Sequence, residues 1–112
     1  MKTLFSLAAI ALISYCSLWP QASLKKGQTP QNHTVEIKQL KFIPDYIEVN
    51  KGDTVTFINR DYVQHDVTEE KAKRWTSGIL KKDESWKTVV KGDEDYFCTL
   101  HVIMKGKIRI KK

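Results

Sequence analysis

The sequence predicts a single all-β domain in the form of a sandwich of short strands. Apolar and polar residues alternate with a period of two over several short stretches, and turn-forming residues separate these stretches at short intervals. The chain has 112 residues, of which 41% are apolar and 29% charged. This size suffices for one hydrophobic core and leaves little room for a second, and the composition is that of a globular protein.

The expected strands follow one another from about Thr34 to the end of the chain. Three early stretches place alternate residues on one face, and three more strands are expected at residues 86–90, 94–98 and 107–111. Residues 69–82 contain helix formers without a long apolar stripe, so a turn of helix or a loop is expected there. The core-facing residues of the early stretches are Val35, Ile37 and, as a weaker candidate, Gln39, then Ile47 and Val49, then Val55, Phe57 and Asn59.

Residues 1–22 are predicted to be a secretory signal peptide. Lys2 supplies a positive charge ahead of the apolar run at residues 4–13, which is too short to span a bilayer. Cleavage after Ala22 competes with a site at Cys16, where a weak resemblance to a lipoprotein processing sequence makes a membrane tether the minority alternative. Residues 23–33 are polar and indicate a linker or frayed N-terminus ahead of a domain at residues 34–112. The protein is therefore expected in the periplasm.

Cys98 is expected to be the lone cysteine of the exported protein, because Cys16 lies within the predicted signal peptide. A lone thiol in an oxidising compartment tends to be oxidised or cross-linked unless something occupies it. A bound metal ion would do so.

The chain is basic, with 19 Lys and Arg against 13 Asp and Glu and a net charge of +6. The lysines are scattered and not interleaved with aromatic residues, so the sequence gives little support for nucleic-acid binding. An acidic protein partner fits this charge better.

Residues 98–104 contain the most informative motif, because Cys98, His101 and Met104 follow one another at spacings of three. A thiolate and a thioether stabilise Cu(I), and imidazole accepts either oxidation state of copper. Two histidines and one cysteine with a weak axial methionine form a blue-copper electron-transfer site, so one more histidine is needed.

His65 is the candidate for that histidine. In a strand, the period of two would put Val63, His65 and Val67 on one apolar and therefore inward face. A core histidine with no metal role is the alternative. His33 lies in the polar linker and is expected to be solvated.

The chain resembles the cupredoxins, the type 1 blue copper proteins related to plastocyanin, and its Cys-x-x-His-x-x-Met loop is most similar to that of the amicyanins. The resemblance runs through residues 42–44, 47–55, 57–59, 65–67, 92–97 and 104–108. It implies a Greek-key β-sandwich of about seven to eight strands. It also implies one copper ion, with His65, Cys98 and His101 as equatorial ligands and Met104 as the axial ligand. The implied activity is the transfer of single electrons between redox proteins, such as a dehydrogenase and a cytochrome.

Asp66 departs from the family pattern, in which an Asn follows the first histidine ligand and ties the two ligand loops together. We expect Asp66 to replace that tie by accepting a hydrogen bond from the hydroxyl of Thr99 or from a backbone amide. A carboxylate near the copper should also stabilise Cu(II) and lower the reduction potential.

Leu100, Val102 and Ile103 flank His101 and predict an apolar docking patch, ringed by lysines that would attract an acidic partner. The alternative is that these residues cap the core. Phe97 points away from Cys98 by strand parity, so it is either partly exposed or part of the core.

Two other functions compete with the electron carrier. A periplasmic copper storage or delivery protein should have a more exposed site rich in Met or His. A copper enzyme needs further histidines, of which only His33 remains, so no catalytic activity is expected. Zinc could occupy the same ligands but cannot transfer electrons. We expect a monomer that does not require a membrane.

Overall fold

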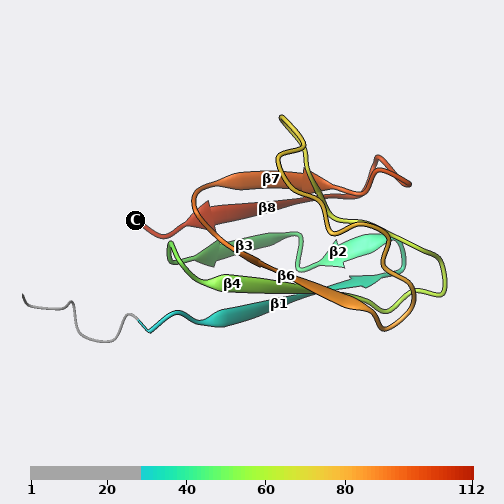
Figure 1. Ribbon diagram of the computed structural model, residues 1–112, viewed down its shortest axis with the longest axis horizontal. Helices are drawn as coiled ribbons and strands as arrows, with labels where there is room; N and C mark the ends of the chain where they lie inside the picture. The colour runs from blue at the N-terminus through green and yellow to red at the C-terminus, as the bar shows by residue number, and fades with distance from the viewer. Residues whose placement is uncertain (1–28) are drawn as a thin grey trace, which may run out of the picture.

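The computed structural model describes residues 29–112, which form a β-sandwich of eight strands (Figure 1). The predicted signal peptide at residues 1–22, and most of the predicted linker, lie outside the described residues. The strands are β1 (Asn32–Lys38), β2 (Lys41–Ile43), β3 (Tyr46–Val49), β4 (Thr54–Asn59), β5 (Thr68–Glu69), β6 (Ser85–Val89), β7 (Glu94–Phe97) and β8 (Lys105–Ile110).

The strands form two sheets of four, in the orders β2-β1-β4-β6 and β3-β8-β7-β5. β1 pairs with β4 in parallel, as β3 does with β8, and the remaining pairs are antiparallel. Because the chain passes repeatedly from one sheet to the other, neighbouring strands are often distant in sequence. The predicted all-β Greek-key sandwich is confirmed. Within residues 29–112, no helix is long and apolar enough to cross a membrane.

The core lies between the sheets and contains most of the alternating residues that the sequence identifies. Phe57 of β4 and Phe42 of β2 pack edge-on against Tyr96 of β7, with ring centroids 5.1 and 4.8 Å apart. The Tyr96 ring lies so close to Gly106 that any side chain at position 106 would overlap it. The fully buried aliphatic residues of the core are Val35, Ile37, Val49, Val55, Val67 and Ile108.

After Glu69, the last residue of β5, residues 70–82 form a loop, which is one of the two alternatives expected there. They contain no helix, because they have no apolar stripe with which a helix could pack. Their backbone is instead organised by the buried carboxylate of Glu69, which accepts hydrogen bonds from the amides of Ala72 and Arg74. Gln39 does not continue β1. It forms the two-residue turn to β2 with Leu40, and both have positive φ angles, 53° and 59°.

His33 corrects the prediction that this residue is solvated in a linker. It lies in β1, which begins two residues earlier than expected, and its side chain is only 23% exposed. Its Nε2 is 2.9 Å from Oδ2 of Asp53, a carboxylate that also accepts hydrogen bonds from the amides of Gln31 and Asn50. A buried carboxylate needs such donors, and His33 supplies one of them.

The carboxylate of Asp53 predicts an acid-sensitive contribution to stability. The hydrogen bond from the Gln31 amide, followed by that from His33, lowers the pKa of Asp53 from its usual 3.8 to about 2. A lowered pKa stabilises the folded protein above pH 3.8, and this contribution is lost as the pH falls through 2. Urea unfolding at pH 5 and at pH 2 should show a smaller loss of stability in Asp53→Asn than in the wild type. An equal loss in both proteins would contradict this assignment.

Connections between strands gather at one end of the sandwich, the right-hand end in Figure 1. The β1–β2 turn, the β4–β5 loop and the β7–β8 loop all lie there, whereas the C-terminus and the start of β1 lie at the opposite end. The sheets thus bring loops that are distant in sequence to one edge of the core.

Candidate metal centre

The loop end of the sandwich brings together three of the side chains that the sequence singled out. Ligand atoms of His65, Cys98 and His101 all lie within 4.8 Å of one another. The Sγ of Cys98 is 3.7 Å from Nδ1 of His65 and 3.9 Å from Nδ1 of His101. The two imidazole rings have centroids 4.9 Å apart and are tilted by 58°. Both histidines therefore direct the same nitrogen toward the sulfur.

His65 is fully buried, as expected, but it does not lie on a regular strand. It forms an isolated antiparallel bridge with Leu80, in which the His65 amide donates to the Leu80 carbonyl and the Leu80 amide donates back. The predicted alternation is wrong, because Val63 is 49% exposed while Asp66 is buried together with Val67. A single bridge, and not strand parity, fixes the depth of His65.

Asn59 at the end of β4 shapes the loop that leads to His65. Its Nδ2 donates hydrogen bonds to the carbonyls of Val63 and Leu80, and its Oδ1 accepts one from the amide of Asp61. A buried amide that satisfies three backbone groups fixes the path of an otherwise irregular loop.

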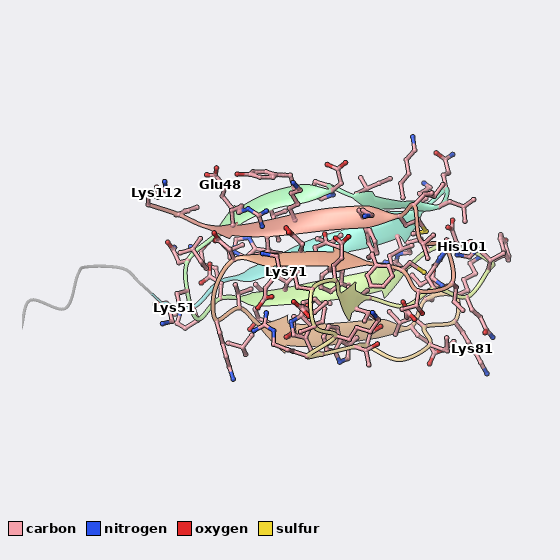
Figure 2. All side chains as sticks on the ribbon, turned by 90° about the horizontal axis from the view of Figure 1, so that it is seen from above. Glu48, Lys51, Lys71, Lys81, His101 and Lys112 are labelled. Carbon is pink, nitrogen blue, oxygen red and sulfur yellow. The ribbon has the colours of Figure 1, made fainter. Side chains whose placement is uncertain are left out.

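The second loop, between β7 and β8, supplies the other two donors. It closes on itself through backbone hydrogen bonds from Cys98 to the Met104 carbonyl, 3.1 Å, and from Met104 to the His101 carbonyl, 2.9 Å. Cys98 and Met104 are both buried in the core, and His101 is partly exposed. Figure 2 shows sulfur atoms at the same end of the sandwich as His101 and far from Lys112.

Asp66 joins the two loops. Its Oδ1 accepts a hydrogen bond of 2.7 Å from the Thr99 amide, and its Oδ2 accepts one from the Thr99 hydroxyl. The Asp66 amide also faces the Sγ of Cys98 at 3.5 Å. The tie predicted between this carboxylate and Thr99 is thus present.

Asp61 is part of the site, although the sequence analysis did not single it out. Its carboxylate is 2.8 Å from Nε2 of His65 and accepts hydrogen bonds from the amides of Gln39 and Leu40. Burial raises the pKa of Asp61, but the hydrogen bonds from Leu40, His65 and Gln39 outweigh burial, and the net pKa lies below the usual value. No local pattern links residues 39, 61 and 65, so this contact was not predictable.

The surface around His101 is apolar. Leu100, Val102 and Ile103 are 49, 61 and 88% exposed, which contradicts the alternative that they cap the core. Leu40 of the β1–β2 turn lines a common hollow with Ile103 and is also exposed. Phe97 is half-buried, with Nζ of Lys73 5.7 Å from its ring centre.

These donors fit copper. A buried thiol with two imidazole nitrogens beside it is a soft set of donors, and within residues 29–112 the Cys98 thiol forms no disulfide. His65 and Cys98 come from different loops on the same rigid sandwich, so the sheets determine the size of the site.

The family assignment follows from comparison with known proteins. Residues 30–111 match the model of the copper binding proteins of the plastocyanin/azurin family, and the chain belongs to this family. The members of this family with which the chain aligns include the amicyanin of Paracoccus denitrificans, to which it is 30% identical over 89 residues. The alignment covers 69% of this chain and 63% of that relative, so the chain spans less than two thirds of its length.

Solved structures give the same result. The crystal structure of amicyanin from Paracoccus versutus superposes with a TM-score of 0.64 at 27% identity, covering 71% of this chain and 81% of that one. A copper-containing nitrite reductase from Thermus scotoductus superposes with a TM-score of 0.67 at 26% identity, but this chain covers only 23% of it. The chain therefore corresponds to only a part of that larger protein.

Replacing Asp66 with Asn should raise the reduction potential of the copper-loaded protein. An Asn side chain can accept a hydrogen bond from the Thr99 amide and donate one to the Thr99 hydroxyl. The tie therefore remains, while a negative charge near the metal is removed. Loss of a buried charge should raise the potential by an amount on the order of tens of millivolts, measured by cyclic voltammetry. The control is Asp83→Asn, which removes an exposed charge paired with Arg60. A potential that is unchanged or lower in Asp66→Asn contradicts the prediction.

Proposed function

We propose that the protein is a blue-copper electron carrier that binds one copper ion through His65, Cys98, His101 and Met104. The convergence of His65, Cys98 and His101 in the fold of a copper-binding family is the observation that carries this proposal. The role of Met104 as the weak axial ligand is supported by its burial at the end of the loop that begins at Cys98.

Copper in such a site exchanges one electron reversibly, and the protein's part is to keep the ligands still. Electron transfer is faster when the metal site changes little between oxidation states, which requires ligands fixed by a packed scaffold. The Leu80 bridge fixes His65, and the closed β7–β8 loop fixes Cys98 and His101. His101 is the only one of these three that is partly exposed, which makes it the proposed point of electron entry and exit.

The partners we propose are redox proteins with an acidic docking surface, such as a dehydrogenase and a cytochrome. The apolar residues Leu100, Val102 and Ile103 would form the centre of the contact. Lysines at this end of the sandwich, among them Lys81, lie on the same side as His101 and would attract an acidic partner (Figure 2). We propose a monomer, because the exposed patch would then remain free for these partners.

Export to the periplasm is supported by the charged residue Lys2 and the apolar run that follows it within residues 1–13. A catalytic role is not proposed. The chain has three histidines, and the one outside the site, His33, pairs with Asp53 at the opposite end of the sandwich. No histidine is therefore left to build a second copper centre.

Addition of Cu(II) to the purified protein should produce an intense blue colour that ascorbate bleaches, because thiolate-to-copper charge transfer requires Cys98. Cys98→Ser should abolish the colour. Met104→Leu should keep the blue colour and raise the reduction potential. Stoichiometric but colourless copper binding that exchanges rapidly with a chelator would reject the carrier and favour copper storage or delivery.

A further inference from the structure

The two histidines of the site have different surroundings, although both direct Nδ1 toward Cys98. His65 is completely buried, and its other ring nitrogen, Nε2, lies 2.8 Å from Oδ2 of Asp61. His101 is partly exposed, and among the described residues its ring has no hydrogen-bond partner besides the Cys98 sulfur. One ligand ring is thus fixed on both sides, and the other is open to the surface.

The contact with Asp61 determines where the proton of His65 lies. A carboxylate accepts hydrogen bonds, so in the neutral imidazole ring this contact puts the hydrogen on Nε2 and leaves the lone pair on Nδ1. The lone pair then points toward the Cys98 sulfur, which is the direction a metal ligand needs. A carboxylate that accepts the Nε2 hydrogen also makes the imidazole a stronger electron donor.

Asp61 itself is held by a strained turn. The amides of Gln39 and Leu40 donate to Oδ1 and Oδ2 of Asp61, at 2.7 and 3.0 Å. Both residues are in the left-handed region, with φ angles of 53° and 59°, where neither glutamine nor leucine is favoured. Two-residue hairpins of this shape ordinarily use Asn-Gly. The side chains at 39 and 40 thus disfavour this turn, and Asp61 offsets part of that cost.

We propose that Asp61 is a positioning residue of the metal centre: its carboxylate fixes His65 with Nδ1 free for copper and anchors this ligand to the β1–β2 turn. The inference rests on the proposed function and deepens it. Asp61 would stabilise Cu(II) relative to Cu(I), because the stronger donation from His65 favours the more highly charged ion. The Leu40 side chain of the same turn lines the hollow beside Ile103, so the anchor also connects the ligand to the proposed docking patch.

The first test uses the protein without metal. Nitrogen-15 NMR of the wild type in weakly alkaline solution should show the His65 hydrogen on Nε2 and none on Nδ1. In Asp61→Asn, which has one acceptor oxygen in place of two, a fraction with the hydrogen on Nδ1 should appear. A hydrogen on Nδ1 in the wild type overturns the proposal, whether or not the variant folds and whether or not copper binds.

The second test uses the copper-loaded protein. Asp61→Asn should weaken Cu(II) binding by about 10 to 100-fold, which is typical for loss of a hydrogen bond to a ligand histidine. Binding of Cu(I) should weaken less, and each tenfold difference raises the potential by about 59 mV for a one-electron couple. The matched control is Asp83→Asn, an exposed carboxylate that pairs with Arg60 and does not contact His65. Equal shifts in the two variants overturn the proposal.

A third variant separates positioning from stability. Gln39→Asn with Leu40→Gly gives the turn a favoured sequence, so adding both changes to Asp61→Asn should restore the thermal unfolding temperature. The potential should remain raised. Recovery of the potential along with the stability would show that Asp61 acts only through the turn. A wild type that binds no copper in a blue site would instead reject the proposed function while leaving the NMR result to test Asp61.

Discussion

The tie between Asp66 and Thr99 is the interaction on which the metal centre depends. The three donors come from two loops, and neither loop alone places the Cys98 sulfur between two imidazoles. Asp66 follows His65 in sequence and Thr99 follows Cys98, so their hydrogen bonds join the loops immediately beside the ligands. These hydrogen bonds are partly buried and have a carboxylate as acceptor, and bonds to a carboxylate are stronger than those between neutral groups.

The packed core of the sandwich holds in place the two loops that this tie joins. Tyr96 of β7 fills the space between Phe42 and Phe57 and packs over Gly106, which fixes the β7–β8 loop relative to the first sheet. Burial of each large apolar side chain contributes about 2 kcal/mol. Because the core is close-packed, the loops cannot separate without exposing it. The packing of the two sheets therefore fixes the positions of the ligand side chains.

Two carboxylates, Asp61 and Asp66, lie within hydrogen-bonding distance of a ligand or of the residue next to one. Both carboxylates are expected to lower the reduction potential. Asp66 places a negative charge beside the metal site, and Asp61 makes His65 a stronger electron donor. Both effects favour the oxidised form, which carries one more positive charge. A carrier of this kind should have a lower potential than one with neutral residues at both positions. Its electron donors would then have to be stronger reductants, and its reduced form could pass electrons to a wider range of acceptors.

The sequence predicted those parts of the protein that depend on local patterns. The alternation of Val35 with Ile37 identified a core face, and the spacing of Cys98, His101 and Met104 identified the loop. Contacts between residues about 20 apart in sequence were missed, because such pairs leave no periodic signal. His33 with Asp53 is one example, and the β1–β2 turn with Asp61 is another. His65 was identified correctly as buried, but its neighbours follow an irregular loop in which parity has no meaning.

The protein imposes the geometry of the site before the metal binds and maintains it in both oxidation states. X-ray absorption spectroscopy of the copper protein in weakly alkaline solution tests this most directly, by comparing the Cu(II) and Cu(I) forms. We expect one short sulfur and two nitrogen neighbours in both forms, with nearly equal distances. A change in the number of neighbours on reduction, or a Cu(II) form without the sulfur, would contradict it.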